Sequence, residues 1–210
     1  MKYHEFEKKH VSRKLKKPSY RTKNLSLLTT FFFIIALGLC AYLPAGINGK
    51  LGTEENKSFT ISRALANANK PSFVAVLFIS YFFLVYLLIV RGPAYLFVRR
   101  IILLTVSFLL LVSLLWVTTS YNVNLHYILA SIIFTFILFY NITTFYLFMQ
   151  ERKTDRNLLL FLIIFNVLVY ISLIIFAILK GDHLDPDVFA AFEIFFTVLF
   201  LANVIFVGYY

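Results

Sequence analysis

Six long apolar segments, separated by short polar ones, dominate the pattern of hydrophobic and polar positions along this chain. They run approximately over residues 25–43, 73–90, 101–117, 127–149, 158–179 and 188–207. About 20 apolar residues are needed for a helix to cross the hydrocarbon of a bilayer. None of the six contains Lys, Arg or Asp, and only the last contains an acid, Glu193. The pattern therefore predicts six membrane-spanning segments.

The type of secondary structure follows from the continuity of these segments. They are uninterrupted apolar runs, whereas the strands of a membrane barrel alternate between apolar and polar residues. In lipid, a helix satisfies its own backbone hydrogen bonds one segment at a time. The first run is also longer than the apolar region of about 7–15 residues in a signal peptide. The predicted fold class is all-α: a polytopic membrane protein with six transmembrane helices in one bundle.

The polar segments define two further parts of the chain. Residues 1–24 form a basic tail before the membrane domain, which extends over residues 25–208. The connection over residues 44–72 is the largest of the five. Pro44 and the glycines that follow it predict that the first helix breaks there, and residues 62–69 can form a short helix lying on the membrane.

Composition agrees with this interpretation and excludes several classes of protein. The chain is 60% hydrophobic and 14% charged, whereas soluble domains have about 45–50% apolar and about 25% charged residues. Its single cysteine excludes an internal disulfide framework and a cysteine-based zinc cluster. No motif for a metal or a cofactor is found, so neither is expected.

The formal net charge of +10 is a signal of topology. Of the 20 Lys and Arg residues, 15 lie in the tail and in the second and fourth connections, and 5 lie in the other connections. Positive residues concentrate on the cytoplasmic side of membrane proteins, so both termini are predicted to be cytoplasmic. The membrane is the plasma membrane or an endomembrane in a eukaryote, or the inner membrane in a bacterium. The tail can bind anionic lipids, and no nucleic-acid surface is predicted.

Glu193 is the first candidate for a functional residue, because a carboxylate at membrane depth costs a few kcal/mol. It can be a packing residue bonded to a neighbouring helix, or a site for a substrate, a proton or a lipid headgroup. A second polar group consists of three amides on three different spans, which lie at similar depth to one another when counted from the cytoplasmic ends: Asn141, Asn166 and Asn203. For these amides we favour interhelical hydrogen bonds over a binding function.

Two histidines are predicted on the outer side. His126 opens the fourth span, and His183 lies in an Asp-rich connection. With Glu193 they can be arranged as a hydrolase site, although their spacing matches no known ligand motif. If the chain is an intramembrane lipid enzyme, Glu193 and His126 are the candidate catalytic residues. Asn56 begins an outer Asn-Lys-Ser sequon and is a candidate for glycosylation in a eukaryotic host.

Three local features resemble the DRAM/Sfk/FRAG family of six-span membrane proteins, which includes autophagy modulators and a GPI-anchor remodelling protein. Ile61-Ser62, with Pro71 and Phe73 downstream, resembles the family's motif in the first outer loop. His126 resembles the histidine that begins its fourth span, and Glu193 the glutamate in its sixth. Arg63 and Ala64 depart from the Asp and Gly that usually follow Ile-Ser, and no Trp follows Glu193.

The resemblance covers residues from about 25 to 208 and implies a regulatory or sensing role in membrane lipid organisation, autophagy or trafficking. Ile61, Ser62, His126 and Glu193 are then expected to contact lipid or a membrane-protein partner. The alternatives are an intramembrane lipid-modifying enzyme and an accessory subunit of a larger membrane complex or transporter. We favour the role without catalysis.

Overall fold

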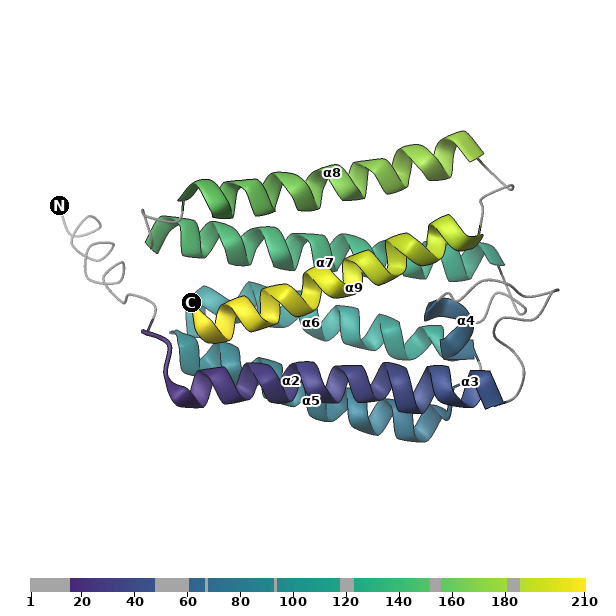
Figure 1. Ribbon diagram of the computed structural model, residues 1–210, viewed down its shortest axis with the longest axis horizontal. Coiled ribbons are helices and arrows are strands. Elements are labelled where there is room, and N and C mark those ends of the chain that lie inside the picture. Colours follow the sequence, from purple (N-terminus) through teal and green to yellow (C-terminus); the bar gives the residue numbers. More distant parts are fainter. Residues whose placement is uncertain are drawn as a thin grey trace.

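The computed structural model describes residues 16–47, 61–66, 68–92, 94–117, 123–151, 156–180 and 186–210, and every regular element in these ranges is helical (Figure 1). Six helices are long and apolar enough to span a membrane, as predicted. They are α2 (Tyr20–Leu37), which continues through η1 (Gly38–Tyr42) and α3 (Leu43–Ile47), and then α5 (Lys70–Arg91), α6 (Ala94–Leu114), α7 (Val123–Glu151), α8 (Arg156–Lys180) and α9 (Pro186–Tyr209).

The first and the last described residues lie at the same end of the bundle. The Lys16 N–H donates to the carbonyl oxygen of Arg91 at 2.9 Å, and Arg91 Nε donates to the carbonyl oxygen of Val207 at 2.8 Å. We call this end the terminal end. The opposite end holds the short helix α4 (Ile61–Ala66) and is called the α4 end (Figure 1).

Helix α9 lies between two groups of packed helices, one formed by α2 and α5 and the other by α6, α7 and α8. Helix α2 packs against α5 and α9, α6 packs against α7, and α7 packs against α8 and α9. In Figure 1, α2 and α5 lie lowest and α8 lies at the upper edge, so α8 is peripheral. Large apolar side chains such as Phe31, Leu109 and Phe161 are more than half exposed. An exterior of this kind suits hydrocarbon rather than water.

The interior holds two clusters of buried side chains. The cluster nearer the terminal end includes Leu87, Phe97, Phe148 and Val204. The cluster nearer the α4 end consists of Ala36, Cys40, Ala41, Ala64, Leu65, Phe73, Leu77 and Leu115. Small residues therefore concentrate where α2, α4 and α5 meet.

The prediction that Pro44 breaks the first helix is wrong, because the helix continues to Ile47 through a π turn. Proline has no N–H to donate to the carbonyl four residues earlier, and its ring clashes with that carbonyl. The turn widens instead: the Leu43 N–H donates to Gly38, five residues back. Because Pro44 has no N–H to donate to the Cys40 carbonyl oxygen, this oxygen accepts the N–H of Asn69 instead, at 2.9 Å.

The short helix of the first connection forms close to its predicted position. It spans Ile61–Ala66, whereas residues 62–69 were expected to be helical. Ala64 and Leu65 are buried against the bundle. The segment therefore docks onto the protein interior rather than lying only on the membrane.

Candidate functional site

Glu193 lies inside the bundle near the α4 end and holds the first residue of α4. Its side chain is 2% exposed, and Oε2 accepts the backbone N–H of Ile61 at 2.5 Å. The first N–H groups of a helix have no partner within that helix, so a carboxylate at this position stabilises its start. Two residues singled out from the sequence, 132 positions apart, are thus in direct contact.

Glu193 also lines a cavity, here called the carboxylate cavity. Its volume is about 70 Å³. Ile61 and Leu65 of α4 cover one side, and Thr197 lies one helical turn from Glu193 on α9. The remaining lining side chains are apolar and come from α2, α6 and α7: Phe33, Leu37, Leu111, Leu114, Ala130, Ile133, Phe134 and Ile137. Glu193 is the one ionisable group among the described residues that line it.

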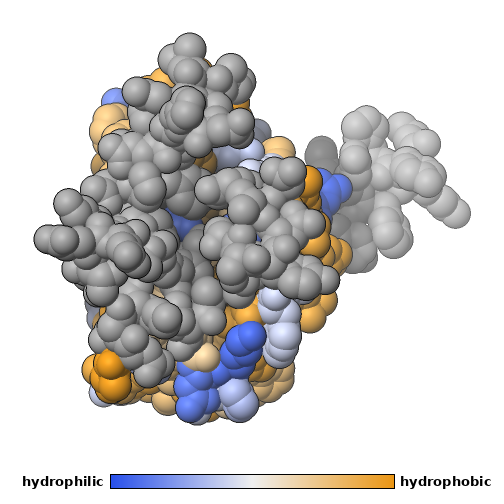
Figure 2. Space-filling view, turned by 90° about the vertical axis from the view of Figure 1, so that its right-hand side faces the viewer, coloured by the Kyte–Doolittle hydropathy of each residue, from blue (hydrophilic) through white to orange (hydrophobic). Residues whose placement is uncertain are grey.

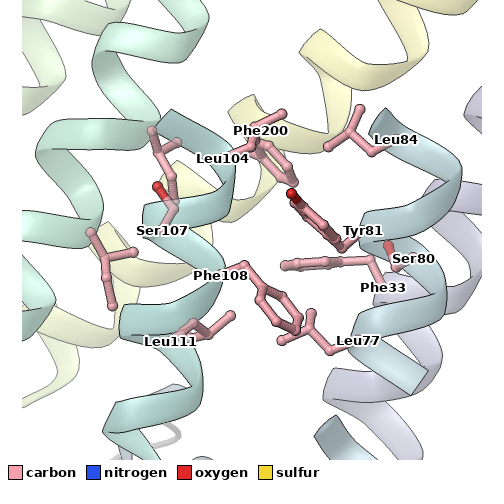
Figure 3. A pocket seen from close by; sticks show the side chains of 12 residues that line it. Phe33, Leu77, Ser80, Tyr81, Leu84, Leu104, Ser107, Phe108, Leu111 and Phe200 are labelled. Atoms are coloured by element: carbon pink, nitrogen blue, oxygen red, sulfur yellow. The ribbon is translucent and has the colours of Figure 1, made fainter. Parts of the chain in front are cut away.

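A second cavity of about 70 Å³ lies deeper in the bundle and is called the central cavity (Figure 3). Its walls come from α2, α5, α6, α7 and α9. Figure 3 shows Phe33 and Tyr81 projecting toward Phe108, with Phe200 on the far side. The Tyr81 and Phe108 rings stack with their centroids 5.0 Å apart.

The polar groups in the wall of the central cavity bond to their own neighbours. Tyr81 Oη lies 2.5 Å from Thr105 Oγ1. Ser80 Oγ donates to the carbonyl oxygen of Thr29 at 2.8 Å, and Ser107 Oγ donates to that of Leu103 at 2.8 Å. The surface that this cavity offers to a ligand is therefore essentially hydrocarbon.

The two cavities adjoin, because four side chains line both of them. These are Phe33, Leu111, Ile133 and Ile137. Along α9, the carboxylate cavity begins at Glu193 and the central cavity reaches Phe200, about 10 Å further at 1.5 Å per residue. An apolar interior thus extends from a single buried carboxylate toward the middle of the bundle.

His126 is buried at the α4 end of α7, with 1% of its side chain exposed. Its Nδ1 lies 2.8 Å from the carbonyl oxygen of Val117, at the end of the α6 segment. Ala130, one helical turn further along α7, lines the carboxylate cavity, whereas His126 is not one of its lining residues. The histidine therefore ties α6 to α7 at the edge of the cavity.

Several candidates from the sequence cannot be placed. Asn56 and His183 lie outside the described residues, and so does the side chain of Ser62. In the part of the chain that the structure describes, no three His, Cys, Asp or Glu side chains gather closely enough to hold a metal ion. Acid–base chemistry in the carboxylate cavity would rest on Glu193 alone among its described lining residues.

The three intramembrane asparagines separate into a pair and a single residue. Asn141 Nδ2 donates to Asn166 Oδ1 at 3.0 Å, joining α7 to α8, and Asn166 Nδ2 donates to its own helix at Leu162. Asn203 is fully buried, and its amide has no hydrogen-bond partner among the described residues. The structure thus brings two of the three amides together.

Two buried arginines are functional positions that the sequence analysis missed. Arg91 is 1% exposed and Arg100 is 7% exposed. Both were counted only as loop charges. Each continues the buried stripe of its helix, four residues after Leu87 on α5 and three after Phe97 on α6. That helical spacing was the signal that could have distinguished them from the exposed Arg99.

Comparison of the chain with protein-family models, with curated protein sequences and with solved structures gave no match. The described residues nevertheless define a class: a protein with six helices long and apolar enough to span a membrane, an exterior suited to lipid, and an apolar cavity whose described lining carries one buried carboxylate.

Proposed function

We propose that this chain is an integral membrane protein that binds the apolar chain of a lipid in its interior and has a regulatory or sensing role. The observation that carries the proposal is the pair of adjoining cavities, with apolar walls and Glu193 at one end. A polar group of the ligand would lie near Glu193, and its chain would extend toward the central cavity.

Helix α4 supplies a reason to favour regulation over catalysis. Ile61 and Leu65 form part of the cavity wall, and Ile61 is bonded to Glu193. A ligand in the carboxylate cavity would therefore contact α4 directly. If its affinity differs between the docked and undocked positions of α4, binding shifts the balance between them. That shift would change the conformation in which a partner protein meets the first connection, residues 44–72.

The resemblance to the DRAM/Sfk/FRAG family is consistent with this proposal, because Ile61 and Glu193 are two of the residues that carry it. We further propose that both termini are cytoplasmic, as the distribution of positive residues predicts. Epitope tags at the two ends should then be reached by antibodies in cells whose plasma membrane alone is permeabilised. A tag that becomes accessible only after all membranes are dissolved, or one accessible on intact cells, would contradict this orientation.

The binding proposal is tested by filling the cavities. Ala130→Phe places a ring in the carboxylate cavity, and Ser107→Leu places a branched chain in the central one. Ala202→Phe adds the same ring to an exposed position of α9 and is the matched control. The purified full chain is examined by native mass spectrometry for lipid that remains bound.

We expect bound lipid in the wild-type chain and in Ala202→Phe, and a several-fold loss in both cavity variants. Glu193→Gln keeps an oxygen that can accept the Ile61 N–H but removes the charge, so it should change which headgroup is retained. Circular dichroism verifies that each variant is folded. Equal lipid content in all folded variants would rule the proposal out.

A further inference from the structure

A groove on the outer surface of the bundle is separate from the two interior cavities. It lies between α5 and α6 at the α4 end, has a volume of about 510 Å³, and shares only Phe108 with the lining of the central cavity. Its lining residues are Lys70, Pro71, Val74, Ala75, Phe78, Phe108, Leu109, Val112 and Trp116.

The groove runs along the helices rather than across them. Its residues on α5 extend from Lys70 to Phe78 and those on the neighbouring segment from Phe108 to Trp116, with the three- to four-residue spacing of one helix face. Eight residues of helix are about 12 Å long, close to the thickness of one leaflet's hydrocarbon, about 15 Å. Ala75 leaves space between the larger side chains, and the Phe78 and Phe108 rings meet at the deeper end, 6.1 Å apart.

The mouth of the groove carries positive charge. Lys70 Nζ lies 5.6 Å from the centre of the Trp116 ring, and among the described residues no carboxylate pairs with this ammonium. Lys70 is the first residue of α5, where the helix dipole favours an anion and disfavours a cation. Tryptophan is typical of the level of lipid headgroups. Figure 2 looks onto this end and shows a hydrophilic patch at its lower edge, the level at which Figure 1 draws the start of α5.

We propose that this groove binds an anionic phospholipid of the adjacent leaflet, with the phosphate at Lys70 and one acyl chain along the groove. The ammonium and the start of α5 both attract negative charge, which complements the phosphate. The apolar walls and the length of the groove match an acyl chain. This site does not depend on the interior cavities.

The single tryptophan of the chain makes the site measurable, because Trp116 lies in the groove. The full chain is reconstituted in bilayers that contain either brominated phosphatidylglycerol or brominated phosphatidylcholine at the same mole fraction. Bromine on an acyl chain quenches tryptophan on contact. One surface cation contributes about 1 kcal/mol to binding of anionic lipid, so we expect roughly a fivefold preference for phosphatidylglycerol.

Matched substitutions locate the preference. Lys70→Gln should reduce it to about one, and Lys70→Arg should retain it. Lys23→Gln is the control at the terminal end, because Lys23 Nζ also lies over an aromatic ring, that of Tyr209, at 5.3 Å; this variant should keep the wild-type ratio. Ala75→Phe fills the groove and should weaken quenching by both lipids, whereas Ala202→Phe at another exposed position should not.

The proposal is overturned if the wild-type chain shows no preference, if Lys70→Gln retains it, or if Lys23→Gln abolishes it equally. It is also overturned if neither brominated lipid quenches Trp116, which is the result expected when a partner helix occupies the groove. Should Lys70→Gln fail to fold, the comparison of Ala75→Phe with Ala202→Phe decides whether an acyl chain lies there.

Discussion

At the scale of single residues, Gly208 marks the tightest contact between α2 and α9. The Thr22 hydroxyl donates to the Gly208 carbonyl oxygen at 3.0 Å. A Cβ atom built on Gly208 would lie 2.2 Å from Ser26 Oγ and 2.9 Å from the Thr22 carbonyl oxygen. Small residues allow two helix backbones to approach closely in a membrane, and here the approach leaves no space for even a methyl group.

Gly208→Ala is therefore expected to destabilise the fold by about 1–3 kcal/mol, the usual cost of overpacking. The free energy of unfolding is measured by titration with sodium dodecyl sulfate from a mild detergent. Gly38→Ala is the matched control, because a Cβ at Gly38 meets nothing within 4 Å. A second substitution, Ser26→Gly, should restore part of the loss. Equal stability of the Gly208→Ala and Gly38→Ala variants would contradict the close contact.

At the scale of secondary-structure elements, α8 is the helix with the fewest attachments to the rest of the bundle. It packs principally against α7, and a buried amide pair, Asn141 to Asn166 at 3.0 Å, joins the two helices. The Phe165 ring also contacts Phe195 of α9, with centroids 5.5 Å apart. A second hydrogen bond joins the Thr135 hydroxyl of α7 to the Tyr170 hydroxyl of α8. Much of the attachment of α8 in an apolar solvent therefore depends on two hydrogen bonds and on aromatic packing.

Asn141→Leu should weaken the docking of α8 by about 0.6–2 kcal/mol, because it leaves Asn166 Oδ1 buried without its donor. Asn203→Leu is the comparison, since the Asn203 amide has no hydrogen-bond partner among the described residues. We expect this second change to be neutral or stabilising. Unfolding in detergent gives both values, and a larger loss for Asn203→Leu would show that its amide has a role that the described contacts do not explain.

Most of the helices could be predicted from the sequence, because an uninterrupted apolar run of this length has one stable conformation in lipid. The irregular part could not. Pro44 indicates an interrupted helix, but whether the chain breaks or widens into a π turn depends on a distant partner for the Cys40 carbonyl. The N–H of Asn69 supplies that partner, and no local pattern predicts this contact.

At the scale of the whole molecule, Arg91 joins four separate parts of the chain at the terminal end. Its guanidinium donates to the carbonyl oxygens of Val207 on α9 and Lys16 before α2, and it lies over the Phe148 ring of α7 at 5.5 Å. The residue itself ends α5. The five donors of a guanidinium are spread over three nitrogens and can reach acceptors that lie further apart than those within reach of the single nitrogen of an ammonium.

Arg91→Leu should cost about 1.5–3 kcal/mol for each hydrogen bond lost, and Arg91→Lys should recover only part of this. Helix α6 provides the control, because Arg99 is exposed and Arg99→Leu should change stability by less than about 0.5 kcal/mol. Unfolding in detergent measures the difference. Equal losses of stability in Arg91→Leu and Arg99→Leu would mean that Arg91 stabilises the fold only through its charge and not through its hydrogen bonds.

The candidate site could be predicted only in part. A carboxylate within an apolar run is visible in the sequence, and so is the Ile61-Ser62 segment, but their contact is a property of the assembled bundle. Each cavity depends on side chains from five helices, and no single segment carries a signal for either of them. For the buried arginines, helical spacing indicates the face that they share with Leu87 and Phe97, but only the assembled bundle shows that this face is covered.

The four side chains shared by the two cavities, Phe33, Leu111, Ile133 and Ile137, have a consequence for selectivity if a lipid chain enters beside Glu193. A short chain would end before these four side chains, whereas a longer one would have to displace them. Packed side chains change between discrete rotamers rather than yielding gradually. The protein would then act as a molecular ruler, with a threshold in acyl length instead of a graded response.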